Sequence, residues 1–387
     1  MCATAAAEKD GSNTDWQKVI DELGPKFAER AGDHDENDTF VFENYAELKE
    51  HRYFSAQIPT ELGGGGLLHS EMCDLIRRLG SYCSSTALAT SMHQHLIAAS
   101  VWNYKHGNPG QKLLEKVAAN ELVLVSTGAK DWLESNGSVE RVEGGYKVSA
   151  VKIFASGSPA GDMVITSAPY EDPEEGWQVL HFPVPLDAEG ARIDEVWRAH
   201  GMRGTGSNNI VLEGVFIPEE AVVLKRSQGE YHPVWNVIIT VALPLIAAAY
   251  VGIAEAAAEI ARERAKKSPT DPVLPILMGE MENQLAITQV MHRSAVAHAN
   301  NWDFEPTVEN GNKGFIHKTV IVRSAAATVA KAVEAAGGPA YLRSSPLERL
   351  WRDVTAGNFH PMAEKRQQLF TGRLAMGLEP ISGAARD

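Results

Sequence analysis

The sequence is poor in cysteine and in positive charge, and both shortages limit what the protein can be. Its 387 residues include three cysteines, Cys2, Cys73 and Cys83, whose spacing matches no metal-binding motif. So few cysteines, odd in number, are typical of reduced thiols, and we expect a cytoplasmic protein. Lys and Arg number 36 against 50 Asp and Glu, a net charge of −14. An acidic surface repels phosphate backbones and anionic lipids, which argues against nucleic-acid and membrane partners.

Several familiar motifs are also missing. The N-terminus has no basic region leading into an apolar stretch, so we expect no secretory signal. Neither G-x-G-x-x-G nor a Walker loop is present, which leaves a nicotinamide domain or a P-loop without a candidate. The long uncharged run at 234–254 contains Asn236, Thr240 and Pro244 and continues into the amphipathic EAAAEIARERAKK. We interpret it as a helix buried in a helical domain rather than as a membrane span.

The hydrophobic period divides the chain into three regions. Residues 1–120 have apolar residues at helical spacing, interrupted by PTELGGGG at 59–66. Residues 121–226 change to period two, which predicts a β-barrel or sandwich with strands at 122–126, 138–142, 146–154, 163–167, 178–184 and 209–216. Residues 227–387 return to long Ala-rich helices, separated by loops at 268–275 and 303–314. The expected fold is α+β, with an N-terminal helical domain, a middle β-barrel domain and a C-terminal four-helix bundle.

This order of regions and four motifs resemble the acyl-CoA dehydrogenase superfamily. PTELGGGG (59–66) is similar to the family's Pro-x-Glu-x-Gly-Gly segment, and GYKVSAVKIFASGSPAGD (145–162) to its Gly-Tyr-x-Leu-Asn-Gly-x-Lys stretch. HGMRGTGSNNIVLEGVFIPEEAV (200–222) resembles the strand that ends the β domain, and AAGGPAYLRSSPLERLWRD (335–353) the C-terminal Gly-Gly and Arg-Asp signature. The motifs follow in the family's order along nearly the whole chain.

The resemblance implies a flavin, FAD or FMN. In the family, the segments that match Ser126-Thr127-Gly128 and Phe154-Ala155-Ser156 line the flavin ring. A neighbouring subunit contributes an Arg, here Arg264, and the Gly-Gly turn, here Gly337-Gly338, so the resemblance implies a homo-oligomer, usually a tetramer. The family's Arg-x-x-Phe-Gly is replaced by Arg264-Ala-Lys-Lys, which leaves FMN or a loosely held reduced flavin open beside FAD. Plainer readings remain: a helix cap for the glycines and a solvated charge for Arg264.

The carboxylate that a dehydrogenase of this family needs is missing from both of its usual positions. That group removes the α-proton of an acyl thioester while hydride leaves for the flavin. In most members it follows the Arg-Asp motif, where this chain has His360 and Pro361; in others it lies on the first bundle helix, whose residues 236–250 include no acid. Glu364 lies one helical turn late and could substitute only if the loop were remodelled.

Oxygen-activating relatives in the superfamily, such as dibenzothiophene monooxygenase, use reduced flavin from a separate reductase. Their polar groups are a His from the N-terminal helices, a Ser of a Ser-Gly turn beside the flavin, and a His near the C-terminus. This chain has a counterpart for each in His95, Ser156 and His360. Histidines whose pKa lies near neutral and a hydroxyl donor can hydrogen-bond a flavin hydroperoxide and supply a proton as its O–O bond breaks.

The sequence therefore favours a monooxygenase acting on an aromatic or heteroatom-containing small molecule. The alternative is an FAD-dependent acyl-CoA dehydrogenase with Glu364 as base and an electron-transfer flavoprotein as partner. A third possibility, a DNA-binding member of the superfamily, is disfavoured by the net negative charge. His93 and His95 are two residues apart on a helix, so at most one faces the pocket, and either could be a core residue. Three large aromatic residues fit either a substrate pocket or the core: Trp132, Trp235 and Phe359.

Overall fold

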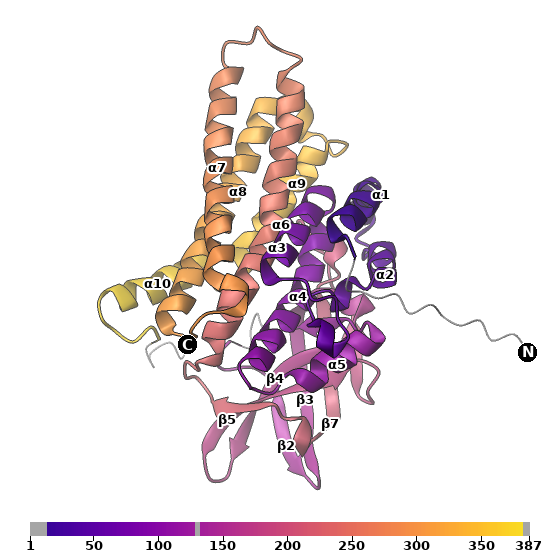
Figure 1. The fold of residues 1–387 in the computed structure, drawn as a ribbon, viewed down its shortest axis with the longest axis vertical. Helices are drawn as coiled ribbons and strands as arrows, with labels where there is room; N and C mark the ends of the chain where they lie inside the picture. The colour runs from indigo at the N-terminus through magenta and orange to yellow at the C-terminus, as the bar shows by residue number, and fades with distance from the viewer. Residues whose placement is uncertain (1–13, 128–131, 382–387) are drawn as a thin grey trace, which may run out of the picture.

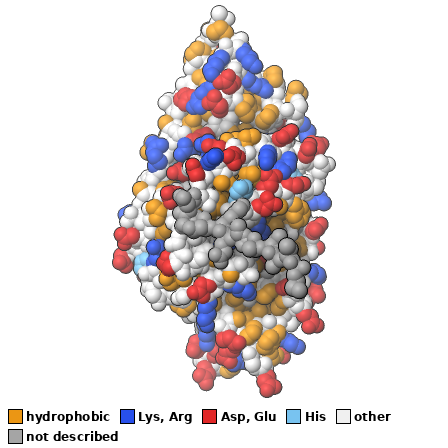
Figure 2. All heavy atoms as spheres, turned by 45° about the vertical axis from the view of Figure 1, so that its right-hand side comes forward, with side chains coloured by type: hydrophobic (Ala, Val, Ile, Leu, Met, Phe, Trp, Pro, Cys, Tyr) orange, Lys and Arg blue, Asp and Glu red, His pale blue; other side chains and the backbone are white. Residues whose placement is uncertain are grey.

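The computed structural model describes residues 14–127 and 132–381, which form three parts in chain order (Figure 1). The long helices of the C-terminal part stand upright in this view, the strands lie at the bottom, and the N-terminal helices pack beside their junction. On the face shown in Figure 2, acidic and basic side chains are interspersed over the bundle, while acidic ones gather at the lower tip. No broad basic patch is visible on that face.

The N-terminal part consists of helices and short turns. Its helices are α1 (Trp16–Asn37), α2 (Phe42–Glu50), α3 (His69–Tyr82), α4 (Ser84–Lys105) and α5 (Gln111–Asn120), with 3-10 turns at Tyr53–Ser55 and Thr60–Leu62. The Asp15 carboxylate caps α1 by accepting from the Lys18 amide, which satisfies one of the free donors at a helix start. Helix α4 is buried on nearly every side because it packs against α3, α5, the C-terminal helices and the first strand of the middle part. Its polar side chains therefore need partners inside the protein.

The middle part contains two four-stranded sheets around one core, so the expected barrel takes the form of two facing sheets. The first has the order β1-β4-β5-β8 and the second β2-β3-β7-β6, and all pairs except β1–β4 are antiparallel. The strands are β1 (Leu124–Ser126), β2 (Ser138–Val142), β3 (Gly145–Ala155), β4 (Met163–Asp172), β5 (Gly176–Pro185), β6 (Ala191–Asp194), β7 (Asn208–Pro218) and β8 (Leu224–Ser227). Period analysis missed β6 and β8 because each is a four-residue edge strand with charged side chains.

The C-terminal part is built on three long helices. These are α6 (Val234–Ala265), α7 (Leu274–Ala299) and α8 (Val308–Ala336); the fourth predicted helix consists of two short ones, α9 (Pro346–Val354) and α10 (Glu364–Ala375). Within the described ranges, α6 has the length and apolarity to cross a membrane, but 94% of its most apolar stretch is buried. It is the central helix of the core, as its small and polar residues predicted.

The expected loop at 303–314 was wrong for its second half, because α8 begins at Val308. The Thr307 hydroxyl caps the helix by accepting from the Asn310 amide. Gly311 and Gly314 let α8 approach α6 closely. A Cβ on Gly311 would lie 2.6 Å from Asn236 Oδ1. A second close approach, between α3 and α6, depends on Gly252, where a Cβ would lie 2.1 Å from the Arg77 carbonyl.

Candidate active site

Helix α4 presents two buried histidines with different roles. The Leu124 amide donates to His93 Nδ1 at 2.9 Å, so the proton lies on Nε2, which donates to the Phe54 carbonyl at 2.7 Å. The two ring nitrogens of His93 thus join α4 to the start of β1 and to the turn at Tyr53–Ser55. Burial lowers the pKa of His93 to about 4, which keeps the ring neutral. His93 is a structural residue.

His95 faces another direction, as its spacing from His93 predicted, and keeps one nitrogen free. Its Nδ1 lies 3.3 Å from the Ser91 carbonyl, which can only accept, so Nδ1 carries the proton. Its Nε2 then offers a lone pair and has no partner among residues 14–127 and 132–381. Burial lowers the pKa of His95 to about 4, so the ring is neutral at neutral pH. His95 can accept a proton or a hydrogen bond at Nε2.

Ser156 begins a chain of three buried hydroxyls. Its Oγ lies 2.7 Å from Ser207 Oγ, which lies 2.7 Å from Thr205 Oγ1, and Thr205 donates to the Met202 carbonyl at 2.8 Å. Because the Thr205 proton is committed to that carbonyl, Ser207 must donate to Thr205, and Ser156 must donate to Ser207. The Ser156 oxygen is therefore left as an acceptor toward any ligand beside it.

Two other residues expected to line the flavin, Phe154 and Ala155, directly precede Ser156 in the sequence. Phe154 has a φ of +58° and a side chain 54% exposed, an uncommon conformation for a residue with a Cβ. Its ring lies edge-on to Trp197, with the centroids 6.2 Å apart. Ala155 is buried, and Thr127 Oγ1 donates to Thr166 at 2.8 Å. An exposed aromatic face beside enclosed hydroxyls fits a flat ring with a polar edge.

Two of the expected flavin contacts can be placed only in part. Ser126 ends β1 opposite Ile165 of β4 and is half-buried. Gly128 lies outside the described residues. The turn after Ser156 is tightly packed, because a Cβ on Gly157 would lie 2.9 Å from Tyr45 Oη and 3.8 Å from the Ala89 carbonyl of α4. The Ser-Gly turn is thus held against α2 and α4.

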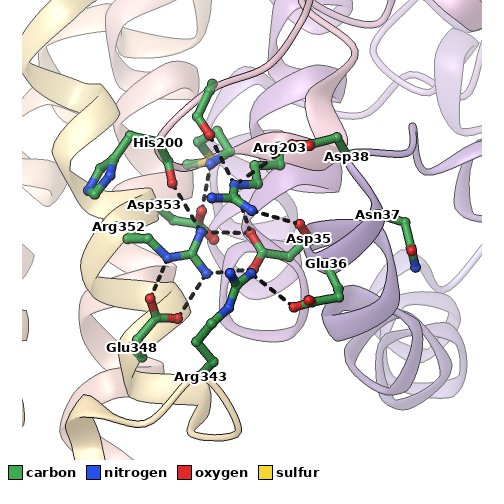
Figure 3. Close-up of polar contacts among 12 residues, drawn as sticks. Asp35, Glu36, Asn37, Asp38, His200, Arg203, Arg343, Glu348, Arg352 and Asp353 are labelled. Carbon is green, nitrogen blue, oxygen red and sulfur yellow. Dashed lines mark hydrogen bonds and ion pairs between the residues drawn. The ribbon is translucent and has the colours of Figure 1, made fainter.

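The Arg-Asp signature anchors this region rather than offering reactive groups (Figure 3). Asp353 of α9 is buried and accepts from the Met202 amide at 2.6 Å, next to the carbonyl that ends the hydroxyl chain. Arg352 binds Asp35 of α1 at 2.5 Å and Glu348 at 2.7 Å. The signature therefore connects α1, α9 and the turn at Arg203–Thr205. A cavity of about 10 Å³ beside it could hold no more than one water molecule.

His360 begins the loop that follows α9 and the 3-10 helix Thr355–Phe359, and it is fixed by two residues that sequence reasoning missed. Its Nε2 lies 2.5 Å from Tyr250 Oη on α6. The Nζ of Lys318 on α8 donates to the carbonyls of His360 at 2.9 Å and Met362 at 3.2 Å. Burial and the Lys318 charge lower the pKa of His360 to about 3. No sequence pattern indicated Lys318, because a lysine on an Ala-rich helix is typical of a solvated face.

The buried carboxylates of the described residues, and Glu364, bind polar partners other than the three candidate catalytic residues. The buried acids in these ranges are Asp35, Glu121 and Asp353, and Glu121 accepts from Ser55 near Arg52. Glu364, the alternative base, starts α10 and lies among three polar partners: Gln368 at 2.8 Å, Lys365 at 3.6 Å and Arg323 at 3.7 Å. No described acid is free and directed toward Ser156 or His360.

The remaining expected residues lie apart from these groups. Arg264 is half-buried near the end of α6, and Gly337-Gly338 are exposed after α8 with open space around both. Trp132 and Trp235 pack 4.9 Å apart in an aromatic cluster with Phe315 and Phe370, so they belong to the core. Phe359 is almost fully exposed. No hydrogen bond, ion pair or ring contact joins any of these six residues to His95, Ser156 or His360 within the described part of one chain, and Phe359 is the chain neighbour of His360.

Comparisons with known proteins agree with this architecture. Residues 17–121 match the acyl-CoA dehydrogenase N-terminal domain, and residues 244–365 match the acyl-CoA dehydrogenase C-terminal domain. The chain is 27% identical to a putative acyl-CoA dehydrogenase, YdbM, of Bacillus subtilis, covering 89% of this chain and 92% of the relative.

Oxygenases are similar to the chain over the same length. It is 25% identical to the oxygenase subunit HsaA, a flavin-dependent monooxygenase of Rhodococcus jostii, covering 88% of this chain and 92% of HsaA. FMN-bound TdsC of Paenibacillus sp. A11-2 has a similar fold, with a TM-score of 0.83 at 18% identity over 95% of this chain and 99% of TdsC. The two domain matches together span more than half of the sequence, in the order that its motifs predicted. The chain belongs to the acyl-CoA dehydrogenase superfamily.

Proposed function

We propose that the protein is an oxygen-activating monooxygenase. It uses reduced FMN or FAD from a separate reductase and acts on a small aromatic or heteroatom-containing molecule. One observation carries the proposal: in the described ranges the expected site offers two neutral histidines and a directed hydroxyl, and no free carboxylate. Acyl-thioester dehydrogenation needs a carboxylate base, whereas oxygen transfer needs hydrogen-bond donors, acceptors and shelter from water.

The direction of the hydroxyl chain supports reduced rather than oxidised flavin. Ser156 is left as an acceptor because its proton is donated to Ser207. Reduced flavin has an N–H at the central ring, where oxidised flavin has a bare nitrogen, so an acceptor suits the reduced form. Ser126, Thr127 and Phe154 would hold the ring beside Ser156. The bound flavin would supply two electrons, so that one oxygen atom enters the substrate and the other leaves as water.

The two histidines can divide the proton transfers between them. The Nε2 lone pair of His95 can accept a proton from a substrate O–H or N–H group. His360 can offer a hydrogen bond to the oxygen atoms through the nitrogen that Tyr250 does not engage. Because both pKa values are low, at about 4 and about 3, neither ring becomes charged in the resting protein at neutral pH. Neutral rings avoid the cost of burying a cation beside the flavin.

A stopped-flow experiment tests the proposal without a known substrate. Protein loaded with reduced FMN is mixed with oxygenated buffer, and oxygen consumption and hydrogen peroxide release are followed separately. The native protein should delay peroxide release relative to oxygen uptake, and His360→Ala should shorten the delay by about 100-fold or more, since loss of one placed hydrogen-bond donor typically costs about two to three decades in rate. His106→Ala, at an exposed histidine, should leave the delay unchanged. Peroxide release by the native protein as prompt as from free FMN would contradict the proposal.

We propose further that the flavin site is completed by a second copy in a cytoplasmic homotetramer. Arg264 has no ion-pair partner in the described part of one chain, and Gly337-Gly338 are open to a neighbour. Exposed Ile287 and Val290 on α7 add apolar surface that an interface would cover. Light scattering should give the mass of four chains, and Arg264→Ala should weaken flavin binding without changing that mass. A monomer that binds flavin with full affinity would refute shared binding.

A further inference from the structure

The hydrogen bond between Tyr250 and His360 has a defined direction. Tyr250 is fully buried on α6, and burial together with the nearby Asp353 charge raises its pKa well above the usual value, so the phenol keeps its proton. Among the described residues, His360 Nε2 is the hydrogen-bond partner of this hydroxyl, at 2.5 Å. If Nε2 carried a proton, the phenol proton would be left buried without an acceptor, which is strongly disfavoured. The phenol therefore donates, and Nε2 accepts.

This direction determines where the imidazole proton lies. A neutral ring that accepts at Nε2 carries its proton on Nδ1. Nδ1 has no partner in residues 14–127 and 132–381 and is not sealed from solvent. The ring thus has one nitrogen fixed in the core and an N–H free for a ligand. His95 has the same tautomer but presents its lone pair, so the two histidines offer opposite groups.

Lys318 fixes the position of the same residue from the other side. Its side chain is buried, and its ammonium group binds the main-chain carbonyls of His360 and Met362. Two bonds from one rigid helix hold the loop on both sides of Pro361. The ammonium charge also opposes protonation of the ring, and Glu364 is the acidic side chain that acts on Lys318.

We propose that Tyr250 and Lys318 are positioning residues for His360, which hold its ring as the neutral Nδ1–H tautomer and so make it a hydrogen-bond donor. The tautomer follows from contacts within this chain. That the N–H is offered to oxygen at a reduced flavin rests on the proposed function.

The tautomer can be measured without flavin. In protein labelled with ¹⁵N-histidine, the native His360 signal, assigned by its loss in His360→Gln, should show a protonated Nδ1 and an unprotonated Nε2. Tyr250→Phe removes the donor and should shift the ring toward the Nε2–H form or a mixture. Tyr104→Phe, on the neighbouring helix α4, should leave the signal unchanged. A protonated Nε2 in the native protein, or no change in Tyr250→Phe, would overturn the proposal.

The consequence for reaction is tested with reduced FMN and oxygen. Tyr250→Phe and Lys318→Met should each shorten the delay before peroxide release by about 10-fold, less than loss of the donor itself, with unchanged affinity for reduced FMN. Lys318→Gln, which keeps an N–H donor, should recover part of the delay, and Lys313→Met, at an exposed lysine of α8, should match the native protein.

The two experiments separate the two ideas. The predicted tautomer without a delay in the native protein would refute the proposed function and leave the positioning intact. A native delay that survives in both Tyr250→Phe and Lys318→Met would refute the positioning and leave the proposed function intact.

Discussion

Ser207→Ala tests the hydroxyl chain most sharply, because Ser207 has no expected contact with flavin. The substitution removes two buried hydrogen bonds of 2.7 Å, to Ser156 and Thr205. At about 0.5–1.5 kcal/mol net for each bond, the free energy of unfolding should fall by about 1–3 kcal/mol. Thr205 keeps its bond to the Met202 carbonyl, so the turn should persist. Urea unfolding measures this change.

The functional effect of Ser207→Ala should pass entirely through Ser156. Without Ser207, the Ser156 proton loses its acceptor, and the hydroxyl can rotate to present a donor toward the flavin. In a double-mutant cycle of Ser156→Ala and Ser207→Ala, the double variant should therefore shorten the delay in peroxide release no more than Ser156→Ala alone. Residues that interact directly typically couple by about 0.5–3 kcal/mol.

Ser158→Ala provides the matched control for this cycle. Ser158 is a buried serine in the same turn, but its hydroxyl donates to the Gly206 carbonyl at 3.0 Å and is no part of the chain. Its loss should lower the free energy of unfolding by about 1 kcal/mol and leave the delay unchanged. Additive effects of Ser156→Ala and Ser207→Ala, or a shortened delay in Ser158→Ala, would refute the directed chain.

Two further predictions concern stability. His69 is buried and donates to the Val241 carbonyl at 2.8 Å, and burial lowers its pKa to about 4. As the pH drops, His69 is therefore protonated in the unfolded chain before it is protonated in the folded protein. Its contribution to the free energy of unfolding falls by about 1.4 kcal/mol per pH unit between about pH 6.5 and pH 4. Because His93, His95 and His360 have lowered pKa values as well and add to the slope, His69→Gln should reduce it by about 1.4 kcal/mol per pH unit in urea titrations rather than abolish it, and an unchanged slope would contradict the assignment. Gly252→Ala should destabilise the protein by about 1–3 kcal/mol or more, because the Arg77 carbonyl occupies the space that a Cβ needs. Gly279→Ala, in open space on α7, should stabilise it by up to about 1 kcal/mol in thermal unfolding. A stabilising Gly252→Ala would refute the close approach of α3 and α6.

Hydrophobic period and motif order predicted most of the architecture from the sequence. The long helices and six of the eight described strands follow from periods of 3.6 and 2, which burial of one face imposes. Elements whose stability depends on distant partners were missed. Strands β6 and β8 are short strands at the edges of their sheets. Helix α8 includes Gly311 and Gly314 because α6 packs closely against these two residues, where there is no room for a side chain. Local signals cannot show such contacts.

Motifs identified the candidate site residues, but not which atoms each one offers. Ser156 and Ser207 are joined over a separation of 51 residues, and His360 and Tyr250 over 110. The direction of each hydrogen bond depends on those partners and on their burial, neither of which a motif contains. Lys318 was invisible for the same reason, since its two acceptors are carbonyls on a loop 42 and 44 residues away. The catalytic roles of His95, Ser156 and His360 stay predictions.

Anaerobic mixing with an acyl-CoA tests the central claim most directly, because it separates oxygen activation from thioester dehydrogenation. Protein loaded with oxidised FAD is mixed with saturated acyl-CoAs of several chain lengths in the absence of oxygen, and flavin absorbance is recorded. Since no described carboxylate is free at the expected site, the flavin should stay oxidised, while the same protein loaded with reduced flavin should react with oxygen. Bleaching of the bound FAD by an acyl-CoA, abolished by Glu364→Gln, would contradict the account.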